Sequence, residues 1–109
     1  MKDYKDEIKK CFAAFDTVDK HKQLSAQLHT WLEKAEEEMQ YGDVNDAITI
    51  VLIILEKLTS RENIQSIFIE CYNKALDITS IILKTPSIRS DVKLLLEYHL
   101  KQIQNISKE

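Results

Sequence analysis

The sequence has very little glycine and proline. One glycine and one proline occur in 109 residues, far below the usual content of globular proteins. Sheets joined by tight turns need more of both residues, so the composition excludes a mainly β protein and predicts an all-α fold. With 44% hydrophobic and 30% charged residues, the chain can bury a core and stay soluble. We expect a single domain over residues 1–109.

No apolar segment is long enough to span a membrane. The most apolar run, Ala47 to Leu55, is interrupted only by Thr49 and falls well short of the roughly 20 residues that a spanning helix needs. The N-terminus is charged from Lys2 to Glu7 and lacks the apolar segment of a signal peptide. We therefore expect a cytoplasmic protein with no membrane partner.

Arginine and positive charge are also scarce. Only two arginines are present and the net charge is −3, whereas nucleic-acid binding usually shows a basic excess. The one lysine-rich segment is interleaved with acidic residues, which indicates a solvated surface. Nucleic-acid binding is thus a weak hypothesis; it would rest on Lys2, Lys5, Lys9 and Lys10.

Catalytic and metal-binding patterns are missing. None of the three histidines has a glutamate three residues before it, the spacing that helical bundles use to bind metals. There is no phosphate-binding glycine loop and no nucleophile elbow. We expect no cofactor, no metal and no enzymatic activity. A metal-binding or catalytic bundle, the rival from another class, would need His29, Glu33 or His99 to converge in a pocket.

The two cysteines, Cys11 and Cys71, both fall on apolar helical faces. Free cysteine behaves as a small hydrophobic residue and is often buried. We expect both thiols to be reduced and buried; a disulfide and a redox pair are the alternatives.

The apolar run from Ala47 to Leu55 organises the predicted fold. It could be a buried strand, but its neighbours have helical spacing and no hairpin dipeptide flanks it. A helix that is apolar nearly all round must be covered on most sides. We therefore predict an antiparallel bundle of four to five helices around a central helix at about residues 43–58.

The remaining helices follow from apolar spacing. They are predicted at residues 3–16, 24–40, about 60–84, and from Pro86 nearly to the C-terminus. The apolar seam of the first is Tyr4, Ile8, Cys11, Phe12 and Phe15. The seam of the fourth is Ile64, Phe68, Cys71, Ala75, Ile78 and Ile82, and that of the last is Ile88, Val92, Leu95, Leu96, Leu100, Ile103 and Ile106. A break is expected between Asp16 and Lys22, although one long helix to residue 40 is an alternative. Trp31 is expected to pack against the central helix.

Four residues are predicted to mark helix ends. Gly42 is predicted to end its helix in the left-handed conformation. Asp43 is predicted to cap the central helix. Thr59 is expected to cap the helix after it, with Glu62 completing a capping box.

Two surfaces are candidates for binding. One face of the central helix carries the polar residues Asn45, Thr49 and Glu56, but the turn between Thr49 and Glu56 is filled by Leu52 and Ile53. An exposed apolar turn needs a cover, so either the first helix folds over this face or another chain binds to it. We favour the second, with the interface formed by Thr49, Leu52, Ile53 and Glu56. The second surface is an acidic cluster that could dock a basic partner or be a solvated corner; it comprises Glu36, Glu37, Glu38, Asp43 and Asp46.

One segment is similar to a tetratricopeptide-repeat hairpin over about a quarter of the chain. The residues with that spacing are Trp31, Ala35, Gly42, Ala47 and Val51. The pattern departs from the repeat at Lys34, Glu38, Ile54 and Thr59, and it does not recur 34 residues later. The resemblance assigns no family, but it favours a helical interaction scaffold.

The sequence therefore predicts a protein–protein interaction module without a catalytic site: an adaptor, regulator or stoichiometric inhibitor that binds a protein partner or a second copy of itself as a homodimer. A small immunity or antitoxin-like neutralising protein is the alternative within this broad class.

Overall fold

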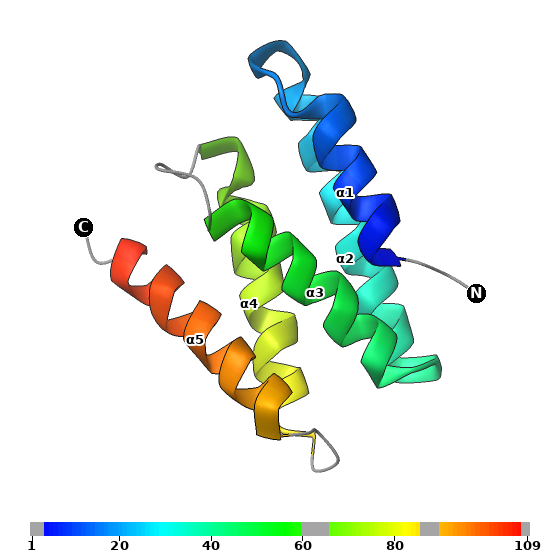
Figure 1. Cartoon of the computed structure of the whole chain (residues 1–109), viewed down its shortest axis with the longest axis vertical. Helices are drawn as coiled ribbons and strands as arrows, with labels where there is room; N and C mark the ends of the chain where they lie inside the picture. The colour runs from blue at the N-terminus through cyan, green and yellow to red at the C-terminus, as the bar shows by residue number, and fades with distance from the viewer. Residues whose placement is uncertain (1–3, 60–65, 86–89, 108–109) are drawn as a thin grey trace.

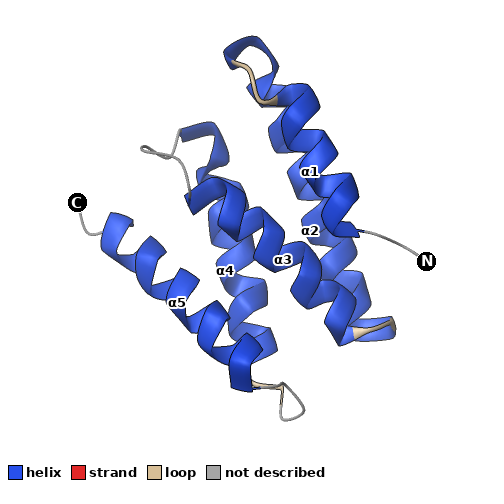
Figure 2. Ribbon diagram, viewed as in Figure 1, coloured by secondary structure: helices blue, strands red, loops and turns tan. Residues whose placement is uncertain are grey.

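The all-α fold class is confirmed. The computed structural model describes residues 4–59, 66–85 and 90–107, and among these it contains helices and turns but no strand (Figure 2). Successive helices run in opposite directions (Figure 1). The five α-helices are α1 (Tyr4–Phe15), α2 (His21–Tyr41), α3 (Val44–Thr59), α4 (Ile69–Leu83) and α5 (Ser90–Ser107), with short 3-10 helices η1 (Val18–Lys20) and η2 (Ser66–Phe68).

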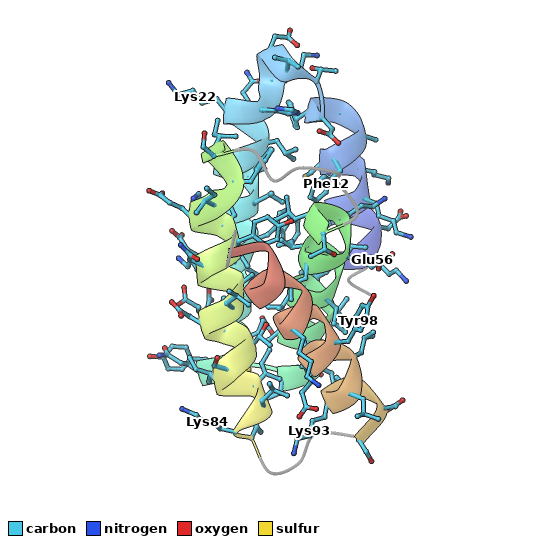
Figure 3. The ribbon with its side chains drawn as sticks, turned by 90° about the vertical axis from the view of Figure 1, so that its left-hand side faces the viewer. Phe12, Lys22, Glu56, Lys84, Lys93 and Tyr98 are labelled. Carbon is cyan, nitrogen blue, oxygen red and sulfur yellow. The ribbon has the colours of Figure 1, made fainter. Side chains whose placement is uncertain are left out.

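The helices form two layers. Helices α1, α3 and α5 lie side by side in one layer, and α2 and α4 lie behind them (Figures 1 and 3). The result is a slab of 41 × 36 × 19 Å. None of the helices within the described residues combines the length and apolar character needed to cross a membrane.

Helix α3 is the central element, as predicted, because it contacts all four other helices. Its buried side chains, which join one continuous core, are Ala47, Ile48, Ile50, Val51, Ile53, Ile54, Leu55 and Leu58. The two-layer arrangement nevertheless differs from a helix enclosed on every side. No helix of the second layer lies over the outer face of α3, which is flanked only by α1 and α5 (Figure 1).

The cap at the start of α3 is as predicted, but the role predicted for Thr59 is not. The Asp43 carboxylate accepts the Asn45 N–H at 2.9 Å, which satisfies one of the unpaired donors at a helix N-terminus. Thr59 lies inside the last turn of α3, where its hydroxyl donates to the Leu55 carbonyl at 2.7 Å. Since α4 begins only at Ile69, the assignment of Thr59 as the cap of the next helix was wrong. Glu62 lies outside the described residues.

The predicted break after α1 is confirmed, so residues 4–41 form two helices. Thr17 is extended, with φ −127° and ψ 154°, and its hydroxyl donates to Asp19 at 2.8 Å. This hydrogen bond lowers the pKa of the Asp19 carboxyl. Oδ1 of Asp16 lies 2.9 Å from Nε2 of the buried His21. Side-chain hydrogen bonds therefore shape this turn, which contains no glycine or proline.

Gly42 does not adopt the predicted left-handed conformation. Its φ is −128° and its ψ is −134°, so another cause explains why a glycine suits this position. A Cβ atom built on Gly42 would lie only 2.5 Å from Oε2 of Glu38. That carboxylate accepts the Asp43 N–H at 3.1 Å. Glycine thus leaves space for a glutamate that folds back to close the α2–α3 turn.

Two residues, Trp31 and Cys11, lie at the edge of the core. Trp31 is only half-buried, and its ring meets Tyr4 of α1 edge-on with 5.6 Å between centroids. It packs partly against the hydrophobic core, to which α3 contributes. Cys71 is buried as expected, but Cys11 is half-buried, and both are free thiols. Burial raises the pKa of the Cys71 thiol.

The two last helices bury the apolar seams that their spacing indicated. The buried seam of α4 comprises Cys71, Ala75, Ile78 and Ile82, and Phe68 of η2 is also buried. In α5, Leu96 is fully buried and Val92 packs partly against the core. The predicted seam residues Ile64 and Ile88 lie outside the described residues, as do the side chains of Leu100, Ile103 and Ile106.

Candidate functional site

The outer face of α3 forms the floor of a shallow groove. Asn45, Thr49, Leu52 and Glu56 recur every three or four residues, so they share this face. Helices α1 and α5 contribute one side chain each to the walls. The groove has a volume of about 210 Å³ and is lined by Lys5, Thr49, Leu52, Ile53, Glu56 and Leu95. The structure therefore brings together all four residues of the predicted interface.

Ile53 differs from the other three members of that set. Its side chain is 1% exposed, because it follows Leu52 by about 100° around the helix and turns into the core. Leu52 is half-buried and Glu56 is exposed. Ile53 is thus a core residue of this chain, as the first of the two sequence-based explanations expected. The rest of the face is open, because α1 lies beside it and does not cover it (Figure 1).

The polar character of the groove is concentrated at two opposite charges. Lys5 of α1 and Glu56 of α3 are both exposed, and the side chain of neither forms an ion pair or hydrogen bond with any described residue. The Thr49 hydroxyl donates to the Asn45 carbonyl at 3.0 Å, so it is already satisfied within the helix. The groove therefore presents the apolar side chains of Leu52 and Leu95 between a cation and an anion that have no partner among the described residues.

An exposed apolar patch on α5 adjoins the groove. It consists of Leu94, Leu95 and Tyr98, which are 66%, 46% and 57% exposed and fall within about 100° of arc on the helix. Glu56 and Tyr98 lie on the same side of the slab (Figure 3). Sequence reasoning placed Leu95 on the buried seam and missed Leu94 and Tyr98. The available signal was the run of three leucines at 94–96, since consecutive residues cannot all face inward.

The predicted acidic docking patch is largely committed to contacts within the chain. Glu36 pairs with Lys74 of α4 at 3.1 Å, and the Asp43 carboxylate caps α3. Glu37 is exposed and Asp46 is half-buried. Fewer charges than the sequence suggested are therefore available to a basic partner.

Glu38, the remaining member of that cluster, makes two contacts with its carboxylate. Its carboxylate accepts the Asp43 N–H and also lies 3.3 Å from the Lys34 ammonium. The hydrogen bond from Lys34 to Glu38 raises the pKa of Lys34. Glu38 is thus a structural residue of the α2–α3 turn.

The described residues do not assemble the metal or catalytic site of the rival hypothesis. His29 lies 3.9 Å from Glu70 of α4, while Glu33 is exposed. Throughout residues 4–59, 66–85 and 90–98, where side chains are described, no three histidine, cysteine or acidic side chains are grouped as metal ligands. The side chain of His99 lies outside the described residues.

The lysines proposed for nucleic-acid binding are similarly dispersed. Lys5, Lys9 and Lys10 are exposed, but Lys5 lines the α3 groove and Lys10 lies 3.5 Å from Asp6. Lys2 lies outside the described residues.

Comparison of the chain with family models, curated proteins and solved structures found no match. The partial similarity to a tetratricopeptide repeat therefore gains no support.

Proposed function

We propose that this protein is a protein–protein interaction module that acts by stoichiometric binding, and that its groove binds a second copy of the same chain. The observation that carries the proposal is the open face of α3. There the side chains of Leu52 and Leu95 lie between Lys5 and Glu56, which form no ion pair with any described residue, and the groove adjoins the exposed α5 patch. An apolar centre with a polar rim is the common anatomy of protein interfaces.

Charge complementarity favours a second copy as the partner. In a twofold dimer each contact occurs twice, so Lys5 of one protomer can face Glu56 of its partner, and the reverse. Both charges are then compensated by the same surface. The slab face that contains the groove measures 41 by 36 Å, which is larger than the roughly 800 Å² that each partner buries in a standard interface.

The first experiment measures molecular mass by light scattering over a range of protein concentrations. The wild-type chain should dimerise, and Leu95→Glu should remain folded but monomeric, because it places a charge on the interface. Val18→Glu is the matched control, since Val18 is 86% exposed and lies in the α1–α2 turn. A wild-type chain that stays monomeric up to about millimolar concentration would contradict self-association.

A charge-swap cycle then tests the geometry. Lys5→Glu and Glu56→Lys should each weaken the dimer by about tenfold or more, because each turns two attractive rim contacts into repulsive ones. The double variant should recover most of the affinity, since the reversed pair is again complementary across the twofold axis. If the double variant is no better than the single ones, the two charges do not face each other and the twofold arrangement is wrong.

A further inference from the structure

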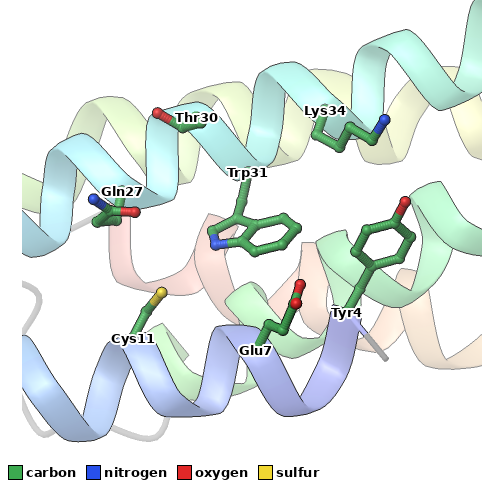
Figure 4. Close-up of a pocket in the computed structure, with 7 residues that line it drawn as sticks. All are labelled: Tyr4, Glu7, Cys11, Gln27, Thr30, Trp31 and Lys34. Carbon is green, nitrogen blue, oxygen red and sulfur yellow. The ribbon is translucent and has the colours of Figure 1, made fainter. Parts of the chain in front are cut away.

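A second opening lies between α1 and α2, away from the α3 groove. It has a volume of about 450 Å³, within the usual range for small-molecule sites. Figure 4 shows its lining side chains, which come from both helices: Tyr4, Glu7, Cys11, Gln27, Thr30, Trp31 and Lys34.

Two aromatic rings form a corner of this cleft. The planes of Tyr4 and Trp31 meet at 76° with their centroids 5.6 Å apart. Tyr4 is almost fully buried and fixes the corner, whereas the half-buried Trp31 leaves part of its indole open to the cleft. The electron-rich face of an indole attracts cations more strongly than any other side-chain ring.

A carboxylate accompanies the rings. Glu7 extends from α1 toward the space between Trp31 and Tyr4 (Figure 4), and it forms no ion pair or hydrogen bond with any described residue. The one cationic side chain that lines the cleft, Lys34, is held by Glu38 at 3.3 Å. The described part of the cleft therefore contains an uncompensated negative charge beside an aromatic surface.

We propose that the α1–α2 cleft binds an organic cation that carries an alkylated ammonium group. Such a group is positive but has apolar methyl groups and few or no N–H donors. It therefore suits a site with one carboxylate and aromatic walls better than a primary ammonium, which needs several acceptors. The group can belong to a free metabolite or to a methylated lysine side chain, and the two sources share this chemistry.

Trp31, the only tryptophan of the chain, reports binding directly. Choline chloride should change its fluorescence saturably, with a dissociation constant on the order of millimolar, and sodium chloride should not. The neutral isostere 3,3-dimethylbutan-1-ol should bind at least about fivefold more weakly, because it lacks the charge. Glu7→Gln should weaken choline binding about threefold or more, and the exposed control Glu33→Gln should not.

A second readout uses the thiols. Choline should slow the alkylation of Cys11, which lines the cleft, and leave that of the buried Cys71 unchanged. A trimethyl-lysine peptide tested beside choline identifies the source: tighter binding of the peptide assigns the site to a modified protein, and tighter binding of choline assigns it to a metabolite. The proposal is overturned if neither compound binds, if the neutral isostere binds equally well, or if Glu7→Gln has no effect.

Discussion

Truncation of Ile53 tests whether the residue beneath the groove belongs to the core. Ile53 is 1% exposed, so Ile53→Ala removes buried carbon atoms beyond Cβ at about 0.8 kcal/mol each, or about 2.4 kcal/mol in all. The cavity left in a packed interior adds to this cost. We expect a loss of about 3–4 kcal/mol, a large part of the 5–15 kcal/mol by which a domain of this size is usually stable.

Its neighbour Leu52 provides the matched control. Leu52 lines the same groove but is half-buried, so Leu52→Ala should cost only about 1–2 kcal/mol. Urea unfolding followed by circular dichroism gives both values. Ile53→Lys should unfold the domain, because it buries a lone charge. A loss below about 1 kcal/mol for Ile53→Ala, or a folded Ile53→Lys variant with normal helicity, would refute the assignment of Ile53 to the core.

Three further predictions concern other parts of the fold. Thiol labelling of the native protein should modify half-buried Cys11 much faster than Cys71, whose pKa is raised by burial; equal rates would contradict the packing of α4. Gly42→Ala should lower the free energy of unfolding in urea by about 1 kcal/mol, because the added Cβ displaces the Glu38 carboxylate. In a Glu38→Ala background the same substitution should be neutral or stabilising. Additive effects of the two substitutions would mean that the two residues do not compete for space. Trp31→Ala should cost about 1–3 kcal/mol, below the range for a fully buried aromatic residue, and a larger loss would show that it packs more deeply.

The sequence predicted the features of this fold that depend on local spacing. The apolar period placed α1 to α4 and the buried seams of α1 and α4, and Asp43 marked the start of α3. The break near Asp16 was found from a loss of helical phase, without any glycine or proline. These features could be predicted because each depends on residues within a few turns of one another.

Features that depend on how the helices are layered were harder to predict. The apolar run of α3 correctly predicted a helix covered on most sides, since four helices contact it. The run did not show whether the remaining face, which carries Thr49 and Glu56, would be covered within the chain. Leu94 and Leu95 face solvent because of the way α5 packs on α3 and α4. Gly42 was assigned a left-handed turn from its residue type alone, whereas its real constraint is the returning Glu38 side chain, which no local pattern shows.

Helix α1 forms a wall of both proposed sites, so their independence can be tested. Lys5 lines the α3 groove and Glu7 lines the α1–α2 cleft. The two residues are separated by about 200° around the axis of α1, so they lie on nearly opposite faces of the helix. Tyr4, Ile8 and Phe12 hold α1 on the core between them. Because both sites are formed in this one position of α1, saturating choline should leave the dimer dissociation constant unchanged within about twofold. Light scattering measures the dimer dissociation constant with and without choline. A larger change in wild type that is absent in Glu7→Gln would contradict a fixed α1. Choline can shift dimerisation through this helix only if it binds two positions of α1 with different affinities.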